Sequence, residues 1–209
     1  MRKTTYDIFF RGVFMSKVLV ITSSPRGESV STFLAAEFAN MLKTEDIEIF
    51  DVSQIDFPVY DEGLLNKFET SGSLPTEDSE FYDSIMNQFI QADRLVFAFP
   101  NWNLMCPPSI VYYMLCACRT GVTFRYTDKG HEGLLTGKKA LIISSCGGKH
   151  IDNDSAFGVS WLRGALQLNG ITDISEVVAD LVEVRRNEQN LIKREALEKL
   201  SEIAKTFLD

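Results

Sequence analysis

Short apolar runs alternate with amphipathic segments along most of this chain, and this alternation strongly constrains its fold. Residues 17–22 (KVLVIT) and 94–99 (RLVFAF) are rich in branched and aromatic side chains and are followed by serine or proline. Such runs are typical of strands that are buried on both faces of a sheet. Between them, residues 32–42 place apolar side chains three and four positions apart, which predicts a helix. A strand, a helix and a further strand form the basic unit of parallel sheets.

The same alternation continues to residue 207. Further strands are predicted at residues 47–52, 139–144 and 174–181, and further helices at residues 77–92, 108–119, 158–169 and 188–207. Residues 57–75 are polar and contain glycine and proline, so we expect a connection without a regular element there. We therefore predict an α/β fold in which an open parallel sheet is covered by helices on both faces. Such sheets bind ligands beyond the carboxyl ends of their strands.

Length and charge limit the class of protein. The 209 residues, 45% of them hydrophobic, suffice for one domain with a sizeable core. A net charge of −8 opposes polyanionic partners, so we expect no nucleic acid and no membrane among the partners. The four cysteines and two histidines lack the spacing of metal ligands. We interpret the cysteines as reduced thiols of a cytoplasmic protein without a metal site.

Residues 1–14 precede the first strand pattern. Their start is basic, and their short apolar stretch is interrupted by Arg11 and lacks a cleavage site of small residues. These features do not fit a signal peptide. We expect a disordered N-terminal extension over residues 1–14 and a single domain over residues 15–209.

The loop after the first predicted strand has the composition of a phosphate-binding loop. Residues 23–32 (SSPRGESVST) combine hydroxyl groups and a glycine with the start of a helix, and a helix start offers free N–H groups and a positive dipole end to an anion. Neither GxxxxGK[ST] nor GxGxxG is present, which argues against a P-loop or a dinucleotide fingerprint. In the alternative interpretation, Ser29 or Ser31 only caps the helix.

Two further loops follow strands of the same predicted sheet. Residues 100–108 (PNWNLMCPP) place amides around a tryptophan, and residues 144–150 (SSCGGKH) contain adjacent glycines that allow a ligand to approach the backbone closely. The amides of the first loop could pair with a heteroaromatic ring, and His150 could donate to a carbonyl oxygen. The alternatives are an ordinary turn, a surface histidine and an inert Cys146.

These loops, together with residues 121–127 (GVTFRYT) and 132–139 (EGLLTGKK), resemble the FMN-dependent NADH-azoreductase family of flavodoxin-like quinone reductases. The resemblance runs in order from about residue 16 to residue 180. It implies a flavodoxin-like three-layer sandwich whose five-stranded parallel sheet has the order 2-1-3-4-5. It also implies non-covalent FMN, NADH or NADPH as electron donor, and a small-molecule quinone or azo acceptor. The family members are homodimers that complete their active sites with a second subunit.

The resemblance also implies the roles of individual residues. The FMN phosphate is expected to meet Ser24, Ser29, Val30 and Ser31. The flavin ring and ribityl chain are expected to meet Pro100, Asn101, Trp102, Asn103 and Leu104, and the pyrimidine side to meet Ser145, Cys146, Gly147, Gly148 and His150. Phe124 and Tyr126 match residues near the substrate space. Three residues depart from the family pattern. Asn101 replaces a large apolar residue, Trp102 replaces a common tyrosine, and Cys146 stands where some members have arginine. We expect these departures to affect the flavin potential and the substrate preference.

The predicted reaction is a ping-pong hydride transfer through FMN, in which donor and acceptor stack in turn on the same ring. The flavin performs the chemistry, so no side chain is predicted to be an obligate acid or base and no catalytic residue is assigned. FMN is expected rather than FAD, because the sequence has one phosphate-binding loop. The alternatives are a flavodoxin-type electron carrier and a hydrolase acting on acyl carrier protein, although no GxSxG motif is present.

Overall fold

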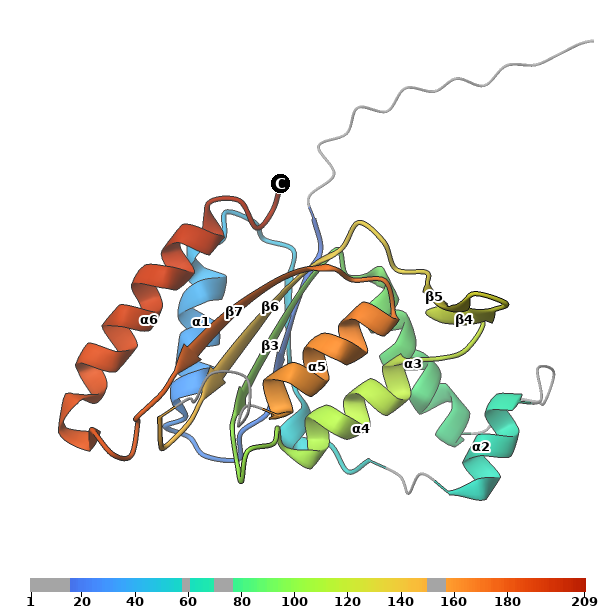
Figure 1. Ribbon diagram of the computed structural model, residues 1–209, viewed down its shortest axis with the longest axis horizontal. Coiled ribbons are helices and arrows are strands. Elements are labelled where there is room, and N and C mark those ends of the chain that lie inside the picture. The colour runs from blue at the N-terminus through green and yellow to red at the C-terminus, as the bar shows by residue number, and fades with distance from the viewer. Residues whose placement is uncertain (1–15, 58–60, 70–76, 150–156) are drawn as a thin grey trace, which may run out of the picture.

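A central parallel sheet lies between two layers of helices (Figure 1). The computed structural model describes residues 16–57, 61–69, 77–149 and 157–209, so the predicted extension over residues 1–14 lies outside the described residues. The sheet has five strands in the order β2-β1-β3-β6-β7. In chain order they are β1 (Val18–Thr22), β2 (Ile47–Asp51), β3 (Arg94–Pro100), β6 (Lys139–Ser145) and β7 (Asp173–Ala179). The predicted order 2-1-3-4-5 is confirmed, since β6 and β7 are the fourth and fifth strands of this sheet.

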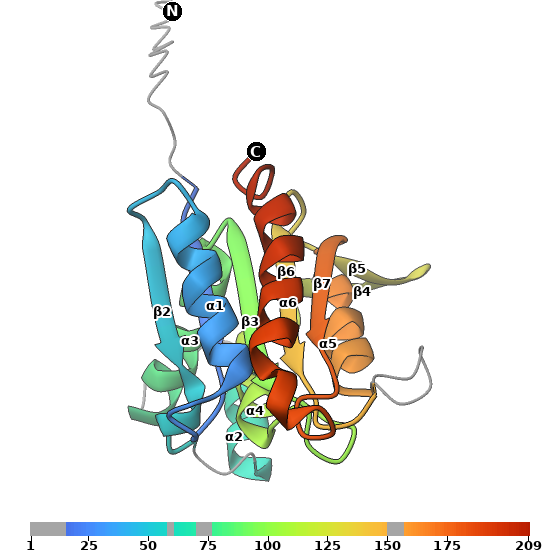
Figure 2. The ribbon, with the colours of Figure 1, turned by 90° about the vertical axis from the view of Figure 1, so that its left-hand side faces the viewer.

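Two helices cover one face of the sheet. Figure 2 shows α1 (Val30–Met41) and α6 (Gln189–Ala204) side by side in front of the strands. Alternate strand residues such as Val20 and Val96 point toward these helices, where Phe38 and Leu200 are completely buried. The period of two along each strand therefore sends every second side chain into this layer.

Three helices cover the opposite face. They are α3 (Glu77–Gln91), α4 (Pro108–Ala117) and α5 (Phe157–Leu168), and they pack on the other strand residues, including Leu19, Leu95 and Phe97. Because both faces of β1, β3 and β6 are buried, these strands read as continuous apolar runs rather than as alternating ones.

The structure corrects the prediction for residues 57–75. Residues 62–69 form α2 (Glu62–Glu69) within the segment expected to lack regular structure. The prediction gave too much weight to the glycine and proline of this segment, because Gly63 falls in the first turn of α2, where a glycine interrupts little of the helix. Leu64, Leu65 and Phe68 have helical spacing in the sequence. Short 3₁₀ turns at Val52–Gln54 and Arg186–Glu188 were also not predicted.

A two-stranded hairpin occupies the long connection between α4 and β6. Its strands are β4 (Phe124–Thr127) and β5 (Gly130–Gly133), and it projects beyond the sandwich in both ribbon views (Figures 1 and 2). The backbone of Gly133 lies directly against that of Gly170, such that a Cβ on Gly133 would lie 2.0 Å from the Gly170 nitrogen. Just beyond β5, the Leu135 N–H donates to the Asn169 carbonyl over 2.8 Å. The base of the hairpin is therefore fixed to the turn that follows α5.

The EGLLTGKK stretch has a structural role. Leu135 is buried, and Gly137 has a φ of +81°, which favours glycine. Lys138 Nζ donates to the carbonyl oxygens of Ile90 and Ala92 over 2.7 and 2.5 Å. A cation that binds the free carbonyls at the end of α3 also complements the helix dipole. The motif thus ties the hairpin to α3 and leads into β6.

Among the helices of the described ranges, none is long and apolar enough to cross a membrane.

We expect Gly133→Ala to destabilise the fold by about 1–3 kcal/mol, because the new methyl group would force the packed backbones apart. Gly164→Ala is the matched control. Gly164 lies inside α5 with nothing near its Cβ position, so alanine should stabilise the protein by about 0.5–1 kcal/mol. Urea denaturation monitored by circular dichroism measures both free energies of unfolding. Equal effects of the two substitutions would contradict this account of the hairpin base.

Candidate functional site

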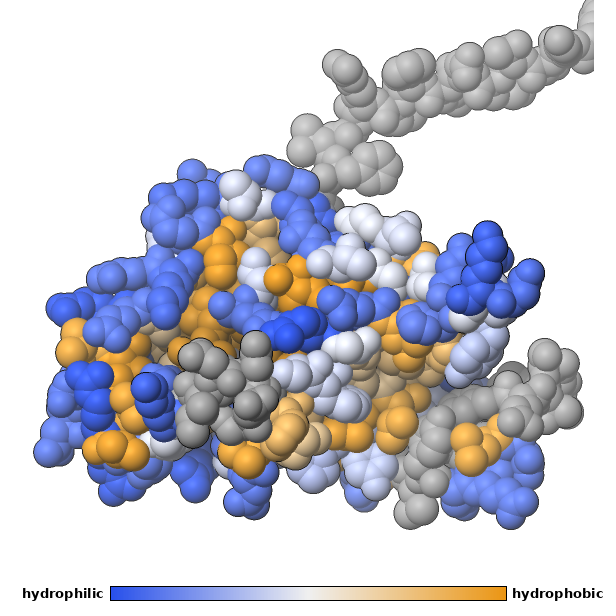
Figure 3. Space-filling view, viewed as in Figure 1, coloured by the Kyte–Doolittle hydropathy of each residue, from blue (hydrophilic) through white to orange (hydrophobic). Residues whose placement is uncertain are grey.

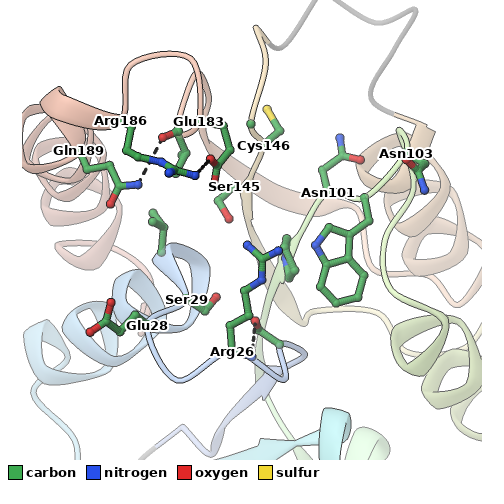
Figure 4. A pocket seen from close by; sticks show the side chains of 16 residues that line it. Arg26, Glu28, Ser29, Asn101, Asn103, Ser145, Cys146, Glu183, Arg186 and Gln189 are labelled. Atoms are coloured by element: carbon green, nitrogen blue, oxygen red, sulfur yellow. Dashed lines mark hydrogen bonds and ion pairs between the residues drawn. The ribbon is translucent and has the colours of Figure 1, made fainter.

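One large cavity lies at the carboxyl ends of the central strands, as expected for an open parallel sheet. Its volume is about 680 Å³, within the range of cofactor sites. Figure 4 shows that its walls come from the loops after β1, β3 and β6 and from the segment that leads into α6. The lining residues are Ser24, Arg26, Glu28, Ser29, Val30, Pro100, Asn101, Trp102, Asn103, Ser145, Cys146, Gly147, Val182, Glu183, Arg186 and Gln189.

The loop after β1 presents a helix start to the cavity. Ser29 is the N-cap of α1, and its hydroxyl accepts from the Thr32 N–H over 3.4 Å and contacts Ser31 Oγ at 3.0 Å. The first turn of α1 contains no acidic residue, so no carboxylate within the helix offsets its positive dipole end. At the base of the loop, the Ser23 and Ser109 hydroxyls are 2.6 Å apart. Ser29 therefore caps α1, and its side chain also lines the cavity.

The loop after β6 is held through its carbonyl oxygens by the segment that follows β7. The carbonyls of Cys146, Gly147 and Gly148 accept from the N–H groups of Val182, Glu183 and Leu181, over 3.1, 3.2 and 2.9 Å respectively. Within the described residues, the Gly147 and Gly148 N–H groups donate to no backbone carbonyl outside regular helices and strands. The acceptors are thus bound to the protein while two donors remain available to a ligand.

The loop after β3 forms the opposite wall through a strained turn. Trp102 and Met105 exchange backbone hydrogen bonds of 2.8 and 3.0 Å, and Asn103 and Leu104 have φ values of +50° and +71°. Leucine rarely adopts this left-handed conformation, which costs of order 1–3 kcal/mol. The Leu104 carbonyl accepts from the Gly158 N–H over 3.0 Å, so α5 helps to hold the turn.

A buried amide oxygen stands beside this turn. Asn101 donates its backbone N–H to the Ser145 carbonyl over 2.7 Å, which joins the β3 and β6 loops. The side-chain oxygen of Asn101 is buried without a hydrogen-bond partner. Such an oxygen is costly to leave unpaired, and the residue that carries it lines the cavity.

The structure brings most of the predicted cofactor residues to this cavity. Ten of them line it, namely Ser24, Ser29, Val30, Pro100, Asn101, Trp102, Asn103, Ser145, Cys146 and Gly147. Ser31, Leu104 and Gly148 are adjacent in sequence to lining residues but do not line the cavity themselves. His150 lies outside the described residues.

The two predicted substrate residues lie on the projecting hairpin. The rings of Phe124 and Tyr126 meet edge to face at 5.7 Å. Phe124 is buried, whereas Tyr126 is 74% exposed, and neither residue lines the cavity.

Six residues that line the cavity were not predicted from the sequence. Four come from the segment after β7, namely Val182, Glu183, Arg186 and Gln189, and two come from the loop after β1, namely Arg26 and Glu28. Glu183 and Arg186 form an ion pair across one helical turn, and Gln189 Nε2 donates to the Val182 carbonyl over 3.3 Å. The available signal was topological. The fifth strand ends at the same edge of the sheet as the other four, so its loop also belonged among the candidates.

The thiol at the cavity is a poor nucleophile. Burial raises the pKa of Cys146 to about 11, with a further contribution from the Asp180 carboxylate. Burial likewise raises the pKa of Cys106 and Cys118 to about 11 and that of Cys116 to about 12. The inert interpretation of Cys146 agrees with these shifts, because the neutral thiol is much less reactive than the thiolate.

Comparison with known proteins agrees with this fold. A family model described as "Flavodoxin-like fold" matches residues 16–204, and the chain belongs to this family. Its relatives include an FMN-dependent NADH:quinone oxidoreductase of Yersinia enterocolitica, 37% identical over an alignment of 175 positions that covers 79% of this chain and 87% of the relative. The protein of the same name from Staphylococcus haemolyticus is 30% identical over an alignment of 208 positions that covers 92% of this chain and 100% of the relative.

A solved structure shares the same arrangement. The FMN-dependent NADH-azoreductase from Bacillus anthracis in complex with FMN has a TM-score of 0.82 and 25% sequence identity, with 93% of this chain and 100% of that chain covered. The predicted resemblance to flavodoxin-like azoreductases and quinone reductases is therefore confirmed.

We expect the native protein to react slowly with iodoacetamide at pH 8, about 100-fold more slowly than an unfolded cysteine, because its thiols are protonated there. The rate should rise as the pH approaches 11, since a raised pKa delays formation of the thiolate. All four cysteines should react in denaturant. Mass spectrometry counts the adducts, and Cys146→Ser identifies the contribution of the cavity thiol. One thiol that reacts rapidly in the native protein at pH 7 would contradict the prediction.

Proposed function

We propose that this protein is an FMN-dependent NAD(P)H oxidoreductase that reduces small quinones or azo compounds. The observation that supports it most directly is the cavity that joins the helix start of α1 to Gly147, whose N–H group donates to no backbone carbonyl of the described residues outside regular helices and strands. A phosphorylated ligand with a polar heteroaromatic ring matches both ends. The relatives named above are FMN-dependent enzymes.

The cavity residues fit FMN. Ser24, Ser29 and the first turn of α1 would bind its phosphate through hydroxyl groups and backbone N–H groups. Asn101, Trp102 and Asn103 would hold the ring from the β3 loop. We propose the same residues as the cofactor site together with Val30, Ser31, Pro100, Leu104, Ser145, Cys146, Gly147, Gly148 and His150.

When bound, FMN supplies a two-electron carrier that accepts a hydride from NADH or NADPH and passes it to an acceptor. The protein contributes position and electrostatics. The N–H groups of Gly147 and Gly148 would stabilise negative charge at the pyrimidine edge of the ring. Cys146 stays a neutral thiol at pH 7 because its pKa is raised, so it adds no charge to that edge. Donor and acceptor would use the same face in turn, which gives ping-pong kinetics.

We further propose a homodimer with shared active sites. Tyr112 and Leu115 lie three positions apart on α4 and are 37% and 38% exposed. Figure 3 shows hydrophobic side chains gathered over α4 and the neighbouring end of α5. Val122 and Tyr126, before and within the hairpin, are also exposed. Exposed apolar side chains gathered on one surface are typical of an interface, and a partner would bring Phe124 and Tyr126 toward a second cavity.

The proposed setting is the cytoplasm, with small molecules as partners and no nucleic acid or membrane. All four cysteines are free, which fits a reducing compartment. The net charge of −8 opposes binding to nucleic acids and to anionic membrane surfaces.

The first test of this function is the chromophore and the activity. The purified protein, reconstituted with FMN, should show an oxidised flavin spectrum, release FMN on heating, and oxidise NADH or NADPH with a soluble quinone. Double-reciprocal plots at several fixed acceptor concentrations should be parallel. Release of FAD, or no flavin after reconstitution, would overturn the proposal. Flavin reduction without quinone turnover would favour the electron-carrier alternative.

Ser29→Gly should weaken FMN binding by about 1–3 kcal/mol, because the hydroxyl is lost from the phosphate site. Glycine is chosen because it replaces serine at a helix N-cap at little cost in stability. Ser84→Ala is the control, since it removes a serine hydroxyl from α3, which does not line the cavity. Fluorescence titration of the apoprotein with FMN gives both affinities. Equal affinities of the wild type and Ser29→Gly would return Ser29 to capping alone.

Leu115→Arg should increase the dimer dissociation constant more than about tenfold, because it places an unpaired charge inside the apolar surface. It should also reduce quinone reduction, since each active site would lose its partner. Ile49→Arg is the control, because Ile49 is 60% exposed on β2 away from α4. Sedimentation velocity across a dilution series reports the assembly. A wild-type monomer with full activity would refute the dimer.

A further inference from the structure

The backbone of Arg26 is held by a hydrogen bond within the loop between β1 and α1. Its backbone N–H donates to Ser24 Oγ over 3.3 Å, and the start of the loop is held by the Ser23 N–H, which donates to the Ala98 carbonyl over 3.0 Å. Figure 4 shows the Arg26 side chain extending from this loop into the cavity, between Ser29 and Asn101. Arg26 is thus an exposed residue whose side chain lines the open cavity.

The charges around the cavity differ in how they are paired. Arg186 forms an ion pair with Glu183, so its charge is largely balanced. Arg26 forms no ion pair with the residues of the described ranges. Its acidic neighbour in the loop, Glu28, points away from it in Figure 4. Arg26 is thus a guanidinium that lines the cavity without a protein counter-charge.

Three groups at this end of the cavity suit the same kind of ligand. The helix start of α1 has no acidic residue in its first turn, the Ser24 and Ser29 hydroxyls line the wall, and Arg26 adds a positive charge. A phosphate monoester is a compact anion with a charge near −2 at pH 7. A guanidinium can bind two of its oxygens at once, which neither a hydroxyl nor a lysine does.

We propose that Arg26 is the residue that makes this site specific for a flavin with a phosphate group, by pairing with that phosphate. This inference rests on the proposed FMN-dependent function and assigns to Arg26 a role that the loop motif of serines does not include. Its consequence is that a phosphate-free flavin, riboflavin, gains nothing from Arg26 and binds only through its ring and ribityl chain.

Titration of protein variants with two flavins, one with and one without a phosphate, tests whether Arg26 binds the phosphate or the rest of the flavin. Apoprotein of the wild type, Arg26→Gln, Arg26→Lys and Arg186→Gln is titrated with FMN and with riboflavin, with flavin fluorescence as the readout. Arg26→Gln should weaken FMN binding about 10- to 100-fold, the effect of one charge-assisted hydrogen bond, and leave riboflavin affinity unchanged. Arg26→Lys should lie between the two. Arg186→Gln should change FMN affinity less than about fivefold, as expected for an exposed ion pair.

Several results would overturn the inference. An equal loss of FMN and riboflavin affinity in Arg26→Gln would place the guanidinium against the flavin ring instead of the phosphate. Unchanged FMN affinity would make Arg26 an ordinary solvated side chain. A larger effect of Arg186→Gln than of Arg26→Gln would move the role to the other arginine. If the wild type bound neither flavin, the proposed function itself would fail, and that outcome is distinguished by the wild-type titration alone.

Discussion

The parallel arrangement of the sheet is the constraint on which the rest of the structure depends. Because every strand runs in the same direction, the strands all end at one edge, and the loops that follow them converge there. The ladders of β1 with β3, β3 with β6 and β6 with β7 set this edge residue by residue. The cavity is lined by loops from four of the five strands, and no single segment of sequence contains it.

Hydrogen bonds between the loops convert this convergence into a defined site. The Asn101 N–H binds the Ser145 carbonyl, and the segment after β7 binds the carbonyls of Cys146, Gly147 and Gly148. Each such bond contributes only about 1 kcal/mol. Their larger effect is on the orientation of the loop. Because its carbonyl groups are bound to the segment after β7, the N–H groups of Gly147 and Gly148 are the groups available to a ligand. The same bonds explain why a site built on loops can still be geometrically precise.

Sequence patterns predicted the layered fold because its strands are long apolar runs whose burial on both faces leaves a strong signal. The serine-rich helix start, the amides and the adjacent glycines left ordinary alternatives open, and the resemblance to a known family singled out ten of the residues that line the cavity. Sequence patterns missed α2 because Gly63 and its polar neighbours resemble a loop. They missed Glu183 and Arg186 because charged residues after a strand are ordinary, and only the pairing of β6 with β7 brings them to the cavity. The left-handed backbone of Leu104 was also unpredictable, since leucine does not favour it.

The turn at Asn103 and Leu104 has a consequence for how this protein could change under selection. Glycine at position 104 would relieve the positive φ, so selection for stability alone would favour it. The same replacement would remove a side chain that is 48% exposed next to Asn103 in the cavity wall. At this turn, a substitution that stabilises the backbone therefore removes a side chain next to the cavity wall. Variants selected for heat tolerance and variants selected for new acceptors should diverge first at these two positions.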